Sequence, residues 1–135
     1  KQDIFIGAAA VADYTPIKPS MKKIKKIEEK ITLELKKNPD ILAAVSQHPK
    51  RPYTVGFAAE TENLEQNALN KMKKKDLNMI AANLVGLSNQ GFGSSENELL
   101  VFYKRSKSHI QRAEKSQIAR SLLSLIAKNY KSSKN

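Results

Sequence analysis

The sequence of 135 residues contains no cysteine and no tryptophan. Without cysteine the chain can form no disulfide, no thiolate zinc site and no thiol nucleophile. No apolar stretch approaches the roughly 20 residues of a transmembrane helix, and the opening residues lack the pattern of a secretory signal peptide. These absences exclude a disulfide scaffold and a membrane-spanning protein, and we expect a soluble cytoplasmic protein with no membrane partner.

Positive charge dominates what is present. Lysine and arginine number 24 against 13 aspartate and glutamate residues, which gives a formal net charge of +11. Such a balance favours anionic partners without saying which kind. Hydrophobic residues make up 40% of the chain, enough for the core of one domain of this length. The composition therefore predicts one domain that handles phosphates or nucleic acid.

Short apolar runs alternate with helical patterns along the chain. This alternation predicts an α/β, Rossmann-like fold with a mostly parallel sheet and helices on both faces. The strand-like runs are residues 3–12, 31–35, 53–58, 79–82 and 99–103. The expected helices begin at a cap formed by Asn38, at Thr61 or Asn63, and before Ile118, with Leu69 among the inward-facing residues of the second.

We assign no clear hydrophobic period to residues 13–30, which contain two prolines and six lysines. They predict a lysine-rich flap, either mobile or folded as a hairpin with a basic rim. The chain opens directly on a strand, with neither turn nor cap before it, so we expect sequence upstream to be missing. Residues 131–135 are expected to form a frayed tail.

Two segments near the start of the chain carry residue types suited to a nucleotide. Small residues follow the first strand, where a ligand can approach the backbone, and Asp13 offers a carboxylate at the edge. A tight turn with a capping aspartate explains the same pattern. In the run 22–26, an inward Lys23 could neutralise charge at a transferring phosphorus; a solvated charge run is the alternative.

Three later features are ambiguous in the same way. Lys71 and Lys75 share a helix face and could clamp a polyphosphate, or they are simply solvated. The helix start at 38–42 offers free N–H groups to an anion or a base edge, or is an ordinary capped helix. Phe57 could stack on a base at a strand end, or it is a core aromatic. No arrangement of serine, histidine and aspartate is evident.

The order of these segments resembles one enzyme family. Residues 9–14 (AAVADY), 23–26 (KIKK), 38–42 (NPDIL) and 56–61 (GFAAET) resemble phosphopantothenoylcysteine synthetase, and residues 71–75, 82–83 and 91–93 extend the match. The resemblance covers nearly the whole chain. In bacteria this domain is usually the C-terminal half of a bifunctional flavoprotein of coenzyme A biosynthesis.

The resemblance implies a phosphopantothenate–cysteine ligase. CTP would activate the carboxylate of 4′-phosphopantothenate as an acyl-cytidylate, and cysteine would then displace CMP to form the amide. Magnesium would accompany the triphosphate. The family further implies a homodimer with sites that involve both subunits, and a fused flavin-dependent decarboxylase domain in the full protein. No FMN is expected on this chain.

The resemblance also implies roles for individual residues. Lys23 would be the catalytic lysine of acyl-cytidylate formation, and no metal ligand is assigned. The expected nucleotide-binding residues are Gly7, Ala8, Ala9, Asp13, Lys23, Pro39, Asp40, Ile41, Leu42, Phe57, Lys71 and Lys75. The family's opening glycine-rich segment has no match here, so residues 1–130 would be the C-terminal part of the synthetase domain. Thr15 and Leu84 stand where the family often has arginine and aspartate.

A nucleic-acid-binding module is the alternative from another class. Residues 104–134 contain nine lysines and arginines against a single acidic residue, Glu114. Such a module would read bases with arginine or aromatic side chains, yet the chain has four arginines and 6% aromatic residues. A third interpretation, a folding or dimerisation unit of a larger enzyme, is compatible with the family resemblance.

Overall fold

A five-stranded mixed sheet forms the centre of the computed structural model, which describes residues 2–25, 29–85, 95–104 and 106–134. The strand order is β1-β4-β5-β6-β7. Neighbours β1, β4 and β5 pair in parallel, whereas β6 is antiparallel to both β5 and β7. Four of the five strands therefore point the same way. The strands are β1 Ile4–Gly7, β4 Tyr53–Glu60, β5 Met79–Leu84, β6 Glu96–Tyr103 and β7 Ser106–Glu114.

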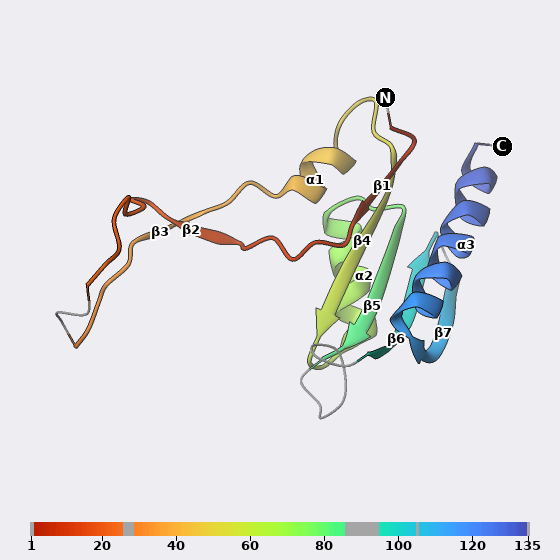
Figure 1. Ribbon diagram of the computed structural model, residues 1–135. Helices are drawn as coiled ribbons and strands as arrows, with labels where there is room; N and C mark the ends of the chain where they lie inside the picture. Colours follow the sequence, from red (N-terminus) through yellow and green to blue (C-terminus); the bar gives the residue numbers. More distant parts are fainter. Residues whose placement is uncertain (1, 26–28, 86–94, 105, 135) are drawn as a thin grey trace.

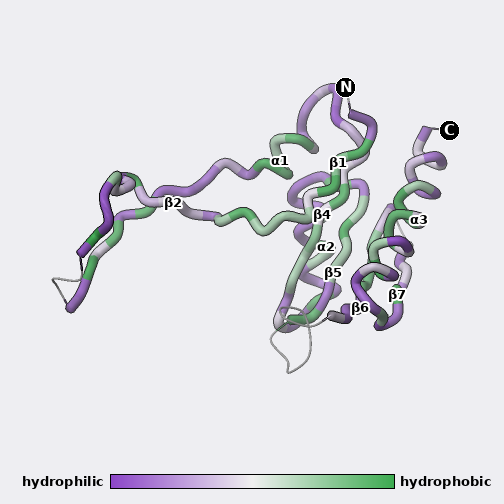
Figure 2. The backbone as a smooth tube through the Cα atoms, viewed as in Figure 1, coloured by the Kyte–Doolittle hydropathy of each residue, from purple (hydrophilic) through white to green (hydrophobic). Residues whose placement is uncertain are grey.

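Helices cover both faces of this sheet (Figure 1). Successive side chains of a strand point to opposite faces, and in β4 and β5 both sets are largely apolar (Figure 2). One set packs against α3, Lys115–Ser133, and the other against α2, Leu64–Lys74, and α1, Ile41–Ser46. The predicted α/β, Rossmann-like fold with a mostly parallel sheet is confirmed.

The lysine-rich flap is a two-stranded arm. We define the arm as residues 14–37, of which 14–25 and 29–37 are described. Strand β2, Tyr14–Pro16, pairs antiparallel with β3, Leu35–Lys37. At its base, Asn38 donates from its backbone N to Asp13 O at 2.8 Å and from Nδ2 to Ala12 O at 2.8 Å. The arm projects away from the sheet in Figure 1, and its two strands favour the hairpin interpretation.

Strand β3 lies later in the sequence than predicted. The alternation at 31–35 predicts a strand there, but β3 occupies Leu35–Lys37. Alternation locates a strand when one of its faces is buried against a core. The described residues of the arm are nearly all exposed, so pairing with β2 and closure by Asn38 determine the strand instead.

Three further differences concern the second half of the chain. Strand β7 was not predicted because it is an edge strand whose few apolar residues, Ile110 and Ala113, are only half-buried. Helix α3 continues to Ser133, so the first residues of the expected frayed tail are helical. Leu69, predicted to face inward, is exposed. Among the described residues, no helix is both long and apolar enough to span a membrane.

Candidate functional site

Two glycines let α1 approach the sheet. Gly7 at the end of β1 is the register partner of Gly56 in β4. A Cβ atom added to Gly56 would lie 2.6 Å from Leu77 Cδ1 and 3.0 Å from Leu42 Cδ2, and one added to Gly7 would lie 3.2 Å from Leu42 Cδ1. The absent side chains thus leave room for Leu42. The structure thereby brings Gly7 together with Leu42.

The cap of α1 differs from the prediction. Asp40, rather than Asn38, is the N-cap residue, and its Oδ1 accepts from Ala43 N at 3.0 Å. Asparagine and aspartate are equally good caps, but the amide of Asn38 is used at the base of the arm. One of the free N–H groups at the start of this helix is therefore already satisfied by the helix's own cap.

Asp40 also binds one of the predicted lysines. Lys75 Nζ lies 2.8 Å from Asp40 Oδ2, and only 22% of the Lys75 side chain is exposed. The hydrogen bond from Lys75 holds the pKa of Asp40 below its ordinary value, with a smaller contribution from the Ala43 N–H and against the opposing effect of burial. The structure thus places the segment 39–42 directly against the C-terminal end of α2.

Lys71, one turn earlier on the same helix, contacts the backbone of β4. Its Nζ donates to Phe57 O at 2.8 Å. Strand β1 ends opposite Gly56, so the sheet offers no β1 partner at Phe57. An ammonium group has three donors, and this bond uses one of them. The remaining donors give Lys71 the capacity to bind an anion at the same place.

The ring of Phe57 does not join these lysines. It packs, half-buried, against the core cluster on the face that α3 covers, whereas α2 lies on the opposite face. The part of Phe57 that reaches Lys71 is its carbonyl oxygen. Of the two interpretations that the sequence left open, the contacts of the ring fit the core aromatic, and base stacking by Phe57 stays a prediction.

The remaining predicted site residues make none of the contacts described for Asp40, Lys71 and Lys75. Lys23 belongs to the arm and is exposed, and the arm projects away from the sheet (Figure 1). Lys26 and the glycine motif at 91–93 lie outside the described residues. Five further predicted nucleotide-binding residues are exposed, in the segment after β1 and at the start of α1: Ala8, Ala9, Asp13, Pro39 and Ile41.

Residues that no sequence pattern singled out join α1 to the end of α2. Ser46, fully buried at the last position of α1, hydrogen-bonds Lys75 O. Arg51 contacts both Ser46 O and Asp76. The bonds to Lys75 and Asp76, which directly follow α2, connect residues 29 and 25 positions apart. Local periodicity carries no signal for contacts over such a separation.

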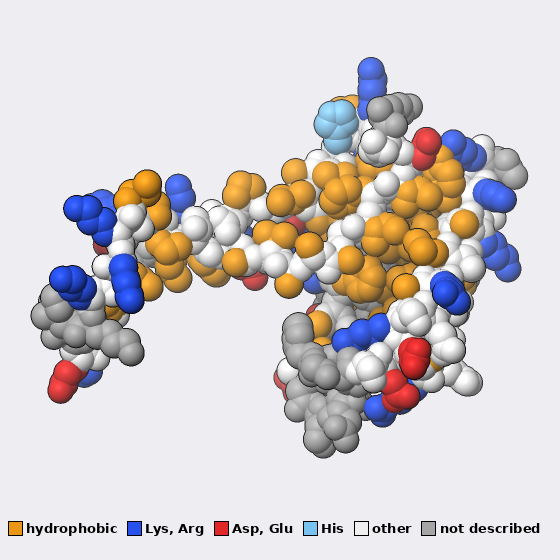
Figure 3. All heavy atoms as spheres, in the orientation of Figure 1, with side chains coloured by type: hydrophobic (Ala, Val, Ile, Leu, Met, Phe, Trp, Pro, Cys, Tyr) orange, Lys and Arg blue, Asp and Glu red, His pale blue; other side chains and the backbone are white. Residues whose placement is uncertain are grey.

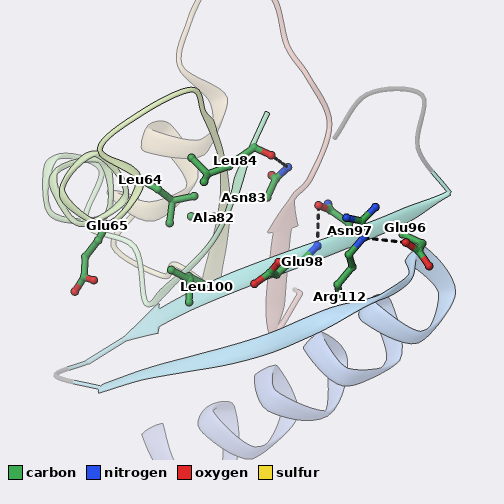
Figure 4. Close-up of a pocket in the computed structure, with 10 residues that line it drawn as sticks. All are labelled: Leu64, Glu65, Ala82, Asn83, Leu84, Glu96, Asn97, Glu98, Leu100 and Arg112. Carbon is green, nitrogen blue, oxygen red and sulfur yellow. Dashed lines mark hydrogen bonds and ion pairs between the residues drawn. The ribbon is translucent and has the colours of Figure 1, made fainter. Parts of the chain in front are cut away.

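A pocket of about 230 Å³ lies at the opposite end of α2 (Figure 4). Helix α2 begins at Leu64, in the pocket wall, and ends before Lys75, which corresponds to about 16 Å of helix. The pocket contains none of the predicted nucleotide-binding residues. Its lining residues are Leu64, Glu65, Ala82, Asn83, Leu84, Glu96, Asn97, Glu98, Leu100 and Arg112.

Two of the three carboxylates of this pocket are paired with cations of β7. Arg112 Nε donates to Glu96 Oε2 at 2.8 Å, and Lys107 Nζ lies 3.0 Å from Glu65 Oε2. Across the described ranges, no group of three or more histidine, aspartate or glutamate side chains is arranged to hold a metal ion. The predicted nucleotide-binding lysines Lys71 and Lys75 lie at the other end of α2.

Comparison with known proteins decides the family. The family model described as DNA/pantothenate metabolism flavoprotein C-terminal domain matches residues 1–130. The chain belongs to this family. Membership confirms the resemblance that the ordered sequence motifs indicated. Nothing in the comparisons supports the alternative of a nucleic-acid-binding module.

The relatives of this flavoprotein C-terminal domain are bifunctional proteins. The coenzyme A biosynthesis bifunctional protein CoaBC of Vibrio cholerae is 44% identical over 126 residues, which cover 91% of this chain and 32% of the relative. The protein of the same name from Escherichia coli K12 is 41% identical over 134 residues, covering 96% and 33%. The chain thus spans about a third of the length of the curated relatives it matches.

Solved structures share the fold. The crystal structure of the C-terminal domain of CoaBC matches with a TM-score of 0.69 and 30% identity, covering 92% of this chain and 53% of that one. A mutant of Cab2 in complex with phosphopantothenate-cysteine matches with a TM-score of 0.63 over 95% of this chain, at 18% identity. The second likeness extends the fold of this family to a distant protein.

Proposed function

We propose that this chain is the ligase part of a phosphopantothenate–cysteine ligase, phosphopantothenoylcysteine synthetase, of coenzyme A biosynthesis. One observation carries the proposal: predicted nucleotide-binding residues from four separate segments, at 7, 39–42, 57 and 71–75, are neighbours in a chain that belongs to this family. The names of its relatives agree with that role.

The proposed reaction has two steps. A carboxylate oxygen of 4′-phosphopantothenate attacks the α-phosphorus of CTP, and the bond to the β-phosphate breaks, so that an acyl-cytidylate and pyrophosphate form. The amino nitrogen of cysteine then attacks the acyl carbon, CMP leaves, and the nitrogen loses a proton. The products are phosphopantothenoylcysteine and CMP. The choice of CTP over ATP rests on the family resemblance.

The residues of the α1 end suit a bound triphosphate. The Lys71 ammonium has donors besides the one that bonds Phe57 O, and the Lys75 ammonium forms an ion pair with Asp40. A phosphate oxygen arriving here would satisfy the ammonium of Lys71 and compete with Asp40 for that of Lys75. The described residues hold no ready metal cluster, so we propose that Mg²⁺ enters with the triphosphate and supplies further charge neutralisation.

We propose that the enzyme is a homodimer in which the arm contacts a second copy. Seven of the thirteen large hydrophobic side chains exposed in the described part of the chain lie on the arm. Figure 3 shows hydrophobic side chains along the arm and on the neighbouring face of the body. A projecting apolar segment favours burial against a partner. Such a contact would also bring Lys23 near the nucleotide site of the second copy.

Charged residues on the arm are expected to dissociate this dimer. The double variant Ile31→Asp/Leu33→Asp should sediment as a monomer, because each aspartate would have to be buried without a partner in the interface. Leu123→Asp is the control, since Leu123 is equally exposed but lies on α3. Sedimentation velocity measures both. A wild-type mass for the arm variant, or the same loss in the control, would contradict the assignment of the arm.

The rest of the protein is proposed from the relatives. Because the chain spans about a third of bifunctional CoaBC proteins, we propose a fused flavin-dependent decarboxylase domain that would carry any FMN, and a cytoplasmic location for both activities.

A ligase assay tests the proposed function. The protein that carries this chain is incubated with 4′-phosphopantothenate, cysteine, Mg²⁺ and either CTP or ATP. Pyrophosphate release that needs both CTP and phosphopantothenate, followed by amide formation only when cysteine is added, is the expected result. Calorimetric titration of the chain with CTP, ATP and CMP locates the nucleotide pocket. Absence of any nucleotide-dependent amide formation would refute the proposal.

A further inference from the structure

Helix α1 is too short to keep its place unaided. It contains six residues, Ile41–Ser46, and an isolated helix of this length is unstable in water because its nucleation is not repaid by enough hydrogen bonds. Its position must therefore come from contacts with the rest of the molecule. These contacts include Asp40 at the N-cap, Leu42 in the first turn against the glycines, and Ser46 at the end.

Ser46 ties the end of α1 to the end of α2. The residue is 0% exposed, and its Oγ lies 3.0 Å from Ala43 O and within hydrogen-bonding distance of Lys75 O. A hydroxyl group has one proton, which these two carbonyls share. Within the protein interior, a carbonyl that loses such a donor is left unsatisfied. Among the contacts of the described residues, Ser46 is the only side chain that donates a hydrogen bond to Lys75 O.

Arg51 reinforces the same junction from outside. Its Nη1 lies 2.9 Å from Ser46 O and 2.8 Å from Asp76 O, and it pairs with the carboxylate of Asp76. Asp76 has a φ of 53°, in the left-handed region where the chain turns away from α2. The guanidinium therefore clamps the backbone on both sides of the Ser46–Lys75 contact.

The geometry makes Lys75 span the length of α1. Its carbonyl is bonded at the last residue of this helix, while its ammonium is bonded to Asp40 at the N-cap. Six residues of helix correspond to about 9 Å, and the backbone and side chain of Lys75 together connect the two ends of α1. The position of its ammonium consequently depends on where its backbone is held.

We propose that Ser46 and Arg51 are positioning residues, which fix the backbone of Lys75 and thereby hold its ammonium at Asp40 and the nucleotide-binding segment 39–42. The role in nucleotide binding rests on the proposed function. The placement of Lys75 against Asp40 does not, and it can be measured without any ligand.

The ligand-free test follows the Asp40 carboxyl by NMR titration in the 135-residue chain. In Ser46→Ala, the Asp40 pKa is expected to rise toward its ordinary range, because the Lys75 ammonium is no longer held beside the carboxylate. Ser124→Ala is the matched control, since Ser124 is exposed on α3 and its Oγ likewise donates to a backbone carbonyl, Arg120 O. An unchanged Asp40 titration in a folded Ser46→Ala would overturn the proposal.

Arg51→Lys provides a second variant in case Ser46→Ala fails to fold. Arg51 is partly exposed, and lysine keeps the charge but cannot bridge several acceptors as a guanidinium does. We expect the same rise of the Asp40 pKa, smaller in size. No rise in Arg51→Lys would likewise count against the clamp.

A double-mutant cycle with CTP separates positioning from general destabilisation. Ser46→Ala is expected to weaken CTP binding about 5- to 10-fold, comparable to the loss of one hydrogen bond. In a Lys75→Met background, the same substitution should have no further effect. An equal loss in both backgrounds would show that Ser46 acts by another route. The cycle is measured in the full protein that carries this chain; if that wild-type protein binds no CTP, the proposed function fails, while the Asp40 titration still decides the positioning role.

Discussion

Replacement of Lys23 by alanine is expected to slow acyl-cytidylate formation by about 100-fold or more in the intact enzyme. When the carboxylate attacks the α-phosphorus, negative charge builds up on its oxygens, and one positioned ammonium stabilises that charge. A group that acts mainly in the transition state lowers the rate more than it weakens substrate binding. The initial rate of pyrophosphate release, with CTP and phosphopantothenate saturating, measures the effect.

Lys22→Ala is the matched control for this variant. Lys22 is the neighbouring residue and is equally exposed on the arm; its backbone N and O are bonded to Ser20 Oγ in a bend. The two variants therefore change the net charge and the composition of the arm in the same way. Pyrophosphate release at the wild-type rate in Lys23→Ala, or the same loss in Lys22→Ala, would remove Lys23 from the catalytic role.

The elements with strong local patterns were predictable from the sequence. Strands β4 and β5 are apolar on both faces and bounded by breakers, and α2 has an inward stripe that includes the buried Ala68. Their alternation with helices was enough to predict the α/β class. The pair Lys71 and Lys75 was also readable, because a spacing of four residues places both on one helix face.

What the sequence could not reveal depends on contacts between distant residues. Strand β7 exists because it pairs with β6, and its own residues are mostly polar. Asn38 and Asp40 are both good N-caps, and only the contact of Asn38 with Ala12 O decides between them. No local pattern distinguishes Ser46 from other serines, because its partner Lys75 O is 29 residues away in the sequence. The sequence also could not reveal that the ring of Phe57 packs on the α3 side of the sheet while its carbonyl oxygen accepts a hydrogen bond from Lys71 of α2.

Substitution of Gly56 by valine is expected to destabilise the fold by about 1–3 kcal/mol, the usual cost of overpacking. The first added carbon already lies 2.6 Å from Leu77 Cδ1 and 3.0 Å from Leu42 Cδ2. Leu77 is buried in the core on this face, so the more exposed α1 must yield, and it carries Leu42 and Asp40 with it. CTP affinity should therefore fall together with stability. Urea unfolding and calorimetric titration measure the two effects.

Ala59→Val is the control for Gly56→Val, because it introduces valine on the same strand at a position where it does not clash with α1 or Leu77. Ala59 is exposed on the same strand, so valine there should change stability by no more than about 0.5 kcal/mol and leave the placement of α1 intact. If Gly56→Val unfolds at the wild-type urea concentration and binds CTP normally, the close approach of Leu42 to the glycines is not what positions segment 39–42. If it loses stability but retains full CTP affinity, α1 moves without carrying the site. In that case Lys71 at Phe57 O, rather than the Asp40–Lys75 pair, would be the main anchor for the triphosphate.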